Sequence, residues 1–360
     1  MGLDAYRLQQ MPFAPVSPER AASLWADRKA TASQIDAVLA DWSYGRASTI
    51  NLLWADLGAG KTHTLYHIQA RCRSNGRLLP IYVLLPATIR KFLELYGAIA
   101  DVLDWAALAP KIDKKQSTRT GRNLVRALEW IANPVDARHL ALAERWVHAE
   151  RLTLAQCAEI GITRTVDDTE SAVEILRIAL GGLGRGERRV VLMVDEYQRV
   201  AEGNRTQKAE IGHAIHTLYN ACPTDLSLVL SCAMGSYQDY SMVLTPEIRS
   251  RLSMHRLELS YMTANDVLQY VADTFEHFRT PGRAVAATFP FERSAVERLA
   301  NFLHEALAGE VTPRTSNQLF SAALLDSLRS GVRAPLSASA MAQWLDSEGP
   351  SLARRLRESV

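Results

Sequence analysis

The segment from Ala55 to Thr62 has the residue types and the spacing of a loop that binds nucleotide phosphates. It consists of Ala55, Asp56, Leu57, Gly58, Ala59, Gly60, Lys61 and Thr62. Glycines let backbone N–H groups close around phosphate oxygens, and the helix that follows adds the positive end of its dipole. We predict that Lys61 reaches the β and γ phosphates and that the Thr62 hydroxyl ligates Mg²⁺. Ala55 stands where glycine is commoner in this Walker A pattern.

Two adjacent carboxylates, Asp195 and Glu196, form the second candidate for chemistry. They follow five apolar residues at positions 190–194, as expected for a strand that carries a Walker B motif. In this interpretation Asp195 holds Mg²⁺ and Glu196 polarises the attacking water. The alternative is a buried strand followed by a solvated acidic turn. We favour the catalytic interpretation because a phosphate-binding loop lies upstream.

The sequence pattern predicts that strands alternating with helices position these residues. Apolar runs occupy 49–55, 79–85, 189–194 and 226–230, with a shorter one at 256–259. Continuous apolar runs separated by helical patterns are typical of a buried parallel sheet. The sequence therefore predicts an α/β fold, a P-loop three-layer sandwich on a five-stranded parallel sheet, followed by a small all-helical lid domain.

The same patterns divide the chain into regions. We predict an N-terminal arm at 1–20, a nucleotide-binding α/β domain at 21–260, a helical lid at 261–335 and a tail at 336–360. Lys61 and Asp195 are 195 − 61 = 134 positions apart, which requires a mostly helical insertion at about 87–186. That insertion is the best candidate for a partner-specific surface.

Composition indicates an ordinary globular protein of 360 residues. The 41 basic and 39 acidic residues give a net charge of +2, which argues against a coat of basic residues committed to nucleic acid. The four cysteines are scattered and suggest neither a disulfide framework nor a zinc site. No signal peptide and no apolar run of membrane-spanning length is evident. We expect a cytoplasmic protein.

Taken in order, these motifs resemble those of an AAA+ ATPase: a strand, the phosphate-binding loop, the carboxylate pair, then PEIRSRL at 246–252 and PRTSNQL at 313–319. Within that superfamily the chain resembles the origin-recognition initiator group and the ATPases that regulate transposition, including WADR at 25–28. The resemblance implies ATP and Mg²⁺ as cofactors, hydrolysis of ATP, and assembly of several subunits.

The resemblance also implies roles for residues outside the two motifs. Arg249 corresponds to the arginine finger offered to a neighbouring subunit, with Arg251 as the alternative. Arg314 corresponds to the sensor-2 arginine of the lid. Ser231 corresponds to sensor 1, with Ser236 as the alternative, because the asparagine common at that place is absent.

Initiators of this kind usually carry a winged-helix DNA-binding domain after the lid. Only 360 − 335 = 25 residues follow Pro335, so we do not expect a self-sufficient origin binder.

Five basic residues crowd the segment 110–123, where they could contact a phosphate backbone or simply form a solvated loop: Lys111, Lys114, Lys115, Arg119 and Arg122.

Two functions therefore stay open. One is an ATP-dependent switch that oligomerises and recruits or regulates a DNA-associated partner. The other is the ATPase subunit of a signalling or antiviral-defence complex that controls a separate effector chain. A small-molecule kinase or a GTPase is disfavoured, because such kinases rarely need the adjacent carboxylate pair and no guanine-recognition motif is present.

Overall fold

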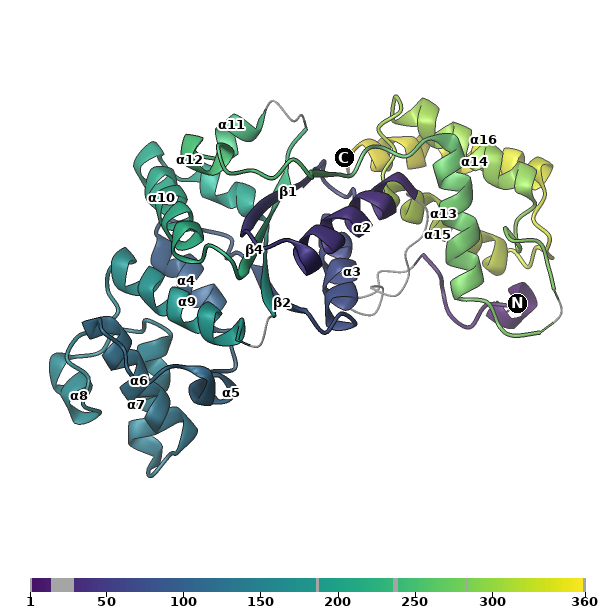
Figure 1. The fold of residues 1–360 in the computed structure, drawn as a ribbon. Coiled ribbons are helices and arrows are strands. Elements are labelled where there is room, and N and C mark those ends of the chain that lie inside the picture. The colour runs from purple at the N-terminus through teal and green to yellow at the C-terminus, as the bar shows by residue number, and fades with distance from the viewer. Residues whose placement is uncertain (1, 14–28, 186–187, 236–238, 283, 359–360) are drawn as a thin grey trace. The chain divides into compact units, whose positions relative to one another are not determined.

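The computed structural model describes residues 2–13, 29–185, 188–235, 239–282 and 284–358 (Figure 1). It contains two compact units. The lid unit comprises Met1–Ser33, Ala55–His67 and Glu258–Val360, and the sheet unit comprises Gln34–Trp54 and Ile68–Leu257. The WADR segment at 25–28 and Ser236 lie outside the described residues.

A five-stranded sheet in the order β2-β3-β4-β1-β5 forms the centre of the sheet unit. Its strands are β1 (Thr49–Ala55), β2 (Leu78–Leu84), β3 (Arg189–Asp195), β4 (Leu226–Ala233) and β5 (Leu257–Glu258). The strands are parallel, and the register pairs Leu84 with Asp195 and Val194 with Leu230. The predicted five-stranded parallel sheet is thus confirmed, with strand ends within a few residues of those expected from the apolar runs.

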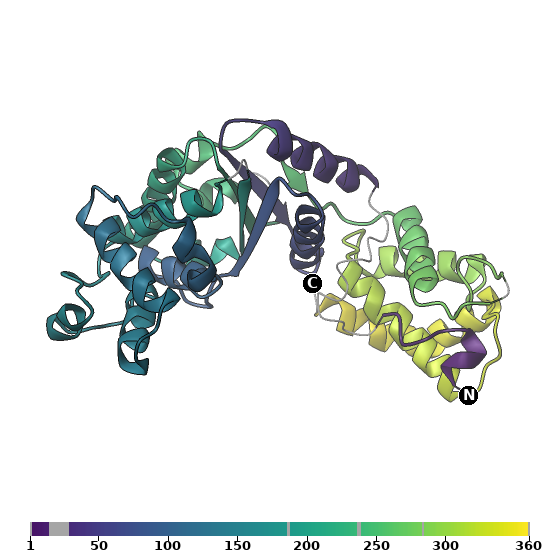
Figure 2. The ribbon, with the colours of Figure 1, turned by 60° about the horizontal axis from the view of Figure 1, so that its bottom comes forward.

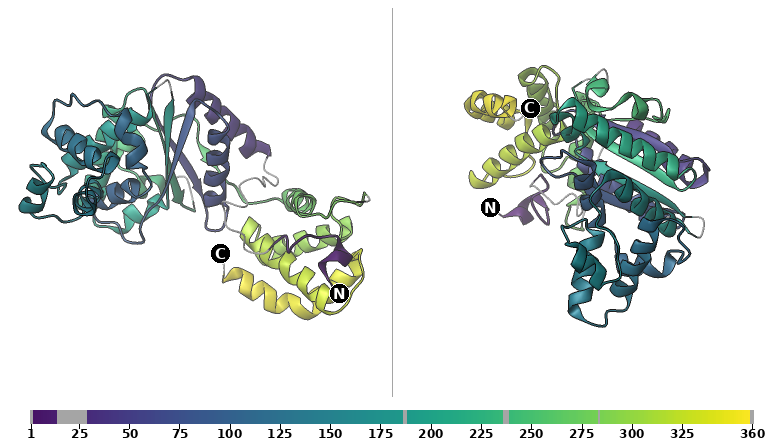
Figure 3. Two further views of the ribbon diagram at one scale, coloured as in Figure 1. Left: turned by 90° about the horizontal axis from the view of Figure 1, so that it is seen from below. Right: turned by 90° about the vertical axis from the view of Figure 1, so that its left-hand side faces the viewer.

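Helices cover both faces of this sheet and make the three layers (Figures 2 and 3). On one side lie α2 (Lys29–Tyr44) and the part of α3 (Lys61–Arg73) that belongs to the sheet unit. On the other side lie α4 (Phe92–Ala100), α9 (Thr169–Leu183) and α10 (Arg205–Ala221). Because both faces are covered, all seven positions of β3 are buried.

The predicted insertion between β2 and β3 is helical, with no strand among its described residues, 85–185. Besides α4 and α9 it contains α5 (Trp105–Leu108), η2 (Ala109–Lys111), α6 (Arg119–Ala132), α7 (Ala137–Val147) and α8 (Leu154–Glu159). Its tryptophans act as anchors: the Trp146 indole donates to the Arg164 carbonyl at 2.8 Å, and the Trp105 indole donates to the Ala100 carbonyl at 3.0 Å. The insertion shares one apolar core with the sheet.

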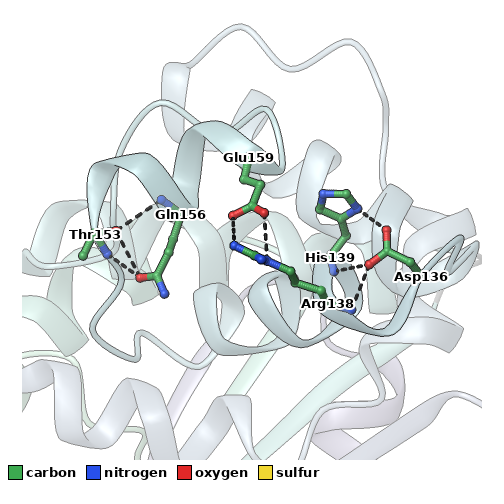
Figure 4. Close-up of polar contacts among 6 residues, drawn as sticks. All are labelled: Asp136, Arg138, His139, Thr153, Gln156 and Glu159. Carbon is green, nitrogen blue, oxygen red and sulfur yellow. Dashed lines mark hydrogen bonds and ion pairs between the residues drawn. The ribbon is translucent and has the colours of Figure 1, made fainter.

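Short polar contacts fix the ends of α7 and α8 (Figure 4). The Asp136 carboxylate caps α7 by accepting from the amides of Arg138 and His139. Thr153 and Gln156 form a capping box at the start of α8. An ion pair of 2.8 Å between Arg138 and Glu159 joins the two helices.

The lid unit has a core of its own, built from α13 (Ala264–His277), α14 (Arg293–Ala306), α15 (Pro313–Arg329) and α16 (Ala338–Arg357). The N-terminal residues join this core through Tyr6, Leu8 and Phe13, and the Tyr6 hydroxyl donates to the Val332 carbonyl at 2.7 Å. Residues expected as a tail form α16, which buries Trp344, Leu352 and Leu356 in the same core. Pro350 lies inside this helix.

Three short elements also belong to the sheet unit: η3 (Tyr197–Glu202) follows β3, and α11 (Tyr240–Val243) and α12 (Pro246–Arg249) follow β4. In the part of the chain that the structure describes, no helix is both long and apolar enough to cross a membrane.

Candidate functional site

The phosphate-binding loop joins the end of β1 to the start of α3. Gly58 and Gly60 have φ angles of 75° and 96°, in the left-handed region that favours glycine. Nothing lies within 4 Å of the point that a Cβ on Gly60 would occupy, so the loop is open on that side. The two glycines thus allow the left-handed backbone conformations that a phosphate-binding loop uses.

Lys61 is the first residue of α3 and is only 6% exposed. Its ammonium donates to the carbonyls of Ala55 at 3.3 Å and Asp56 at 3.0 Å, so the side chain folds over the loop that precedes it. Thr62 follows as a half-buried residue in the first turn of the helix. The two side chains expected to meet phosphate and Mg²⁺ therefore start from the turn where the helix dipole is positive.

Arg314 of the lid packs against this loop within the lid unit. A Cβ built on Gly58 would lie 3.1 Å from the Arg314 Cβ and 3.2 Å from its Nε. Arg314 is the second residue of α15, whose start is fixed by a capping box between Thr312 and Thr315. The structure therefore brings the predicted sensor-2 arginine to the phosphate-binding loop, and Arg314 as a whole residue stays exposed.

Tyr261 is a contact of the loop that the sequence analysis missed. Its hydroxyl donates a hydrogen bond to the Asp56 carboxylate. That bond is the main cause of a raised pKa of the Tyr261 hydroxyl, because the carboxylate stabilises the protonated phenol. Tyr261 stands in a connecting segment with no periodicity, so no local signal in the sequence marks it.

In the sheet unit, Asp195 is the last residue of β3 and is fully buried. Its carboxylate accepts from the Tyr82 hydroxyl at 3.0 Å through Oδ2 and from the Glu196 amide at 2.9 Å through Oδ1. With a donor on each oxygen, the orientation of the carboxylate is fixed. Tyr82, on the neighbouring strand β2, was also missed, because its contact depends on strand order and register.

Glu196 follows in a left-handed backbone conformation, with φ 61° and ψ 33°. For a residue other than glycine this conformation costs about 1–2 kcal/mol and is concentrated at functional sites. Its half-buried carboxylate accepts from the Gln198 amide at 2.8 Å and lies 3.5 Å from the Arg199 guanidinium. The side chain is thus held by two partners from its own turn.

Ser231, the predicted sensor-1 residue, lies in β4 and is fully buried. Its hydroxyl has no hydrogen-bond partner among the described residues. Since Val194 pairs with Leu230, Ser231 and Asp195 occupy the next positions on neighbouring strands. A buried hydroxyl without a partner is costly, and a polar ligand at this strand end would satisfy it.

Of the two arginines considered for the finger, Arg249 is the one held in place. Its guanidinium lies 5.6 Å from the centre of the Tyr240 ring, and its Nε is buried without a hydrogen-bond partner among the described residues. Burial, followed by the charge of Arg249, lowers the pKa of the nearby Lys208 ammonium. Arg251 is exposed.

The basic segment of the insertion, Lys111 to Arg122, spans η2 and the start of α6. All five of its lysines and arginines are exposed: Lys111, Lys114, Lys115, Arg119 and Arg122. Arg119 donates to the Thr163 hydroxyl at 2.9 Å, and Arg122 donates to the Ser117 carbonyl at 2.6 Å. None of the five makes an ion pair with a carboxylate of the described residues.

Solved structures of other proteins share this fold. No family model and no curated protein matches the sequence. Among solved structures, the Aeropyrum pernix ORC1 protein in complex with DNA is 17% identical, with a TM-score of 0.50 over 89% of this chain and 64% of that one. The Aeropyrum pernix ORC2 protein in ADPNP-ADP complexes is 13% identical, with a TM-score of 0.54 over 89% and 67%.

The chain thus spans about two thirds of the length of these two proteins. At this level of identity the likeness concerns the fold. The chain has the fold of these two solved structures, in agreement with the AAA+ architecture that the order of the sequence motifs predicted.

The contact between Gly58 and Arg314 makes the loop sensitive to a single methyl group. We predict that Gly58→Ala lowers the free energy of unfolding by about 1–2 kcal/mol, because alanine disfavours a φ of 75° and its Cβ would press on Arg314. Gly76→Ala is the matched control, since its Cβ would meet nothing within 4 Å. Urea unfolding measures both, and equal stability of the two variants would contradict the packing described.

Proposed function

We propose that this chain is a Mg²⁺-dependent ATPase that works as an AAA+ molecular switch. The observation that carries the proposal is the combination, in one AAA+ fold, of a glycine loop around Lys61 with a buried carboxylate at the end of β3. ATP hydrolysis requires cations around the phosphates and a positioned water, and little else from the protein. These residues are of the types that meet both requirements.

In this proposal Lys61 contacts the β and γ phosphates, and the loop backbone from Ala55 to Gly60 surrounds them. Thr62 and Asp195 would hold Mg²⁺, which when bound neutralises charge on the phosphate oxygens. Glu196 orients the attacking water as its general base. Ser231, buried and unsatisfied, is suited to donate to the nucleotide or to that water.

Two arginines complete the proposed site. Arg314 reaches the phosphates from the lid, which is supported by its packing on Gly58. Arg249 acts as the finger for the nucleotide of a neighbouring copy, so the active form is a homo-oligomer. The support for Arg249 over Arg251 is its fixed position on the Tyr240 ring.

The switch would act on a DNA-associated partner. Support comes from the ORC1 structure, solved in complex with DNA, and from the basic segment Lys111 to Arg122, whose five cations lack carboxylate partners among the described residues. Exposed cations of this kind bind a phosphate backbone through release of its counterions.

We also propose that the protein acts in the cytoplasm, consistent with four buried free cysteines.

The second candidate is the ATPase subunit of a signalling or antiviral-defence complex with its effector on a separate chain. The helical insertion, which gives the AAA+ fold an additional surface, suits this function equally well. The genes next to this one discriminate between the two: a transposase favours the DNA-associated switch, and a nuclease or toxin operon favours the defence complex.

Binding and hydrolysis of ATP should separate in two variants. We predict that Lys61→Ala weakens binding of a fluorescent ATP analogue at least about tenfold, because the phosphates lose their main cation. Glu196→Gln should keep the affinity and lower turnover about 100-fold, because the amide keeps the shape without the base. Glu202→Gln, at the exposed end of η3, is the control and should be unchanged. Wild-type turnover in Glu196→Gln would refute the assignment of the base.

The trans role of Arg249 should appear in mixtures of inactive subunits. Arg249→Ala keeps the phosphate-binding loop and Lys61→Ala keeps the finger, so their mixture should recover part of the turnover that neither has alone. Wild-type turnover per subunit should also rise with protein concentration across the assembly transition. If the two variants assemble together and the mixture stays inactive, Arg249 is not the finger.

A further inference from the structure

Gln198 connects the carboxylate of Glu196 to the end of strand β4. Its Nε2 donates to Glu196 Oε2 at 2.8 Å, and its Oε1 accepts from the Ala233 amide at 2.9 Å. Ala233 is the last residue of β4, two positions after Ser231. The side chain of Gln198 therefore spans from the proposed base to the neighbouring strand end.

The chemistry of these two neighbours dictates how the amide of Gln198 is oriented. A backbone N–H can only donate, and an ionised carboxylate can only accept. Only a side chain with an acceptor at one end and a donor at the other satisfies both at once. A glutamate of the same size would offer two acceptors at neutral pH and would face Glu196 with a like charge.

A second group ties Glu196 to β2. The Arg199 guanidinium lies 3.5 Å from Glu196 Oε2 and also donates to the carbonyl of Leu85, the residue directly after β2. Arg199 and Glu196 are both about three-quarters buried, with side-chain exposures of 25% and 26%. Water therefore competes only in part for hydrogen bonds to the Glu196 carboxylate. Protein groups set the direction of this carboxylate.

The backbone of Glu196 has an unfavourable conformation, so the direction of its carboxylate is maintained at a cost in free energy. A left-handed glutamate is unfavourable and persists only where its surroundings fix it. The bonds to Gln198 and Arg199 belong to those surroundings, as does the bond from the Glu196 amide to Asp195. The conformation thus fixes the orientation of the Glu196 carboxylate, and a general base requires such a fixed orientation.

We propose that Gln198 is a positioning residue for ATP hydrolysis, which orients the Glu196 carboxylate from the end of β4. This inference rests on the proposed function, since it requires that Glu196 is the base. Gln198 touches neither nucleotide nor water in this scheme and acts only through Glu196. Its loss should therefore lower kcat and leave nucleotide affinity unchanged.

The test compares turnover and nucleotide affinity in Gln198→Glu, an almost isosteric change. At pH 8 two adjacent carboxylates repel, so Glu196 is turned away. Asp195 and Arg199 are the other charged groups next to Glu196, and they are unchanged. We expect turnover about tenfold below wild type and unchanged affinity for a fluorescent ATP analogue.

Two further variants control for charge and for folding. Gln207→Glu adds the same charge nine residues away, where a carboxylate also completes the capping box with Asn204, so its turnover should match wild type. Gln198→Met removes the donor and the acceptor without adding charge, so its turnover should also fall. Binding of a fluorescent ATP analogue should be as tight as wild type in all three variants.

The outcomes separate this inference from the function on which it rests. Wild-type turnover in Glu196→Gln would remove the base and with it any role for Gln198. If Glu196→Gln is inactive, two results would still overturn the inference alone. These are a Gln198→Glu turnover that matches Gln207→Glu, and loss of nucleotide binding in both Gln198 variants.

Discussion

A parallel sheet covered on both faces leaves polar side chains few places to act other than the strand ends. Strand β3 shows the consequence, because each of its residues is buried and its only charged residues are Arg189 and Asp195, one at each end. The Arg189 guanidinium donates to the carbonyls of Gly45 at 2.6 Å and Ala47 at 2.8 Å, and burial lowers its pKa. That end of the sheet is closed by internal hydrogen bonds. The opposite end carries the proposed chemistry.

The carboxyl ends of the strands therefore determine which side chains can cooperate. Asp195 and Ser231 occupy neighbouring positions because β3 and β4 pair in register. Tyr82 lies on the same side of β2 as Leu84, which pairs with Asp195, and so its hydroxyl reaches that carboxylate. Gln198 also contacts this end of the sheet, because its side chain extends from the turn after β3 to the end of β4. The positions of these side chains follow from the sheet and not from local sequence.

This explains how much of the molecule the sequence could predict. The strands were predictable because full burial requires continuous apolar runs, and the loop at Lys61 was predictable because phosphate binding restricts residue types at fixed spacing. Tyr82, Gln198 and Tyr261 were not predictable, because their contacts with Asp195, the Ala233 amide and Asp56 depend on register or tertiary packing. The sequence analysis assigned 336–360 to a tail, and the formation of α16 there depends on packing of its apolar residues in the lid core.

The central claim is that the phosphate-binding loop and the carboxylate at the end of β3 serve one Mg²⁺-bound nucleotide. The most direct measurement is the affinity for a fluorescent ATP analogue with Mg²⁺ and with a chelator, in wild type and in Asp195→Asn. The account predicts that Mg²⁺ tightens binding about tenfold or more in wild type and has little effect in Asp195→Asn, where one ligand of the ion has lost its charge. An equal gain from Mg²⁺ in both proteins would contradict it.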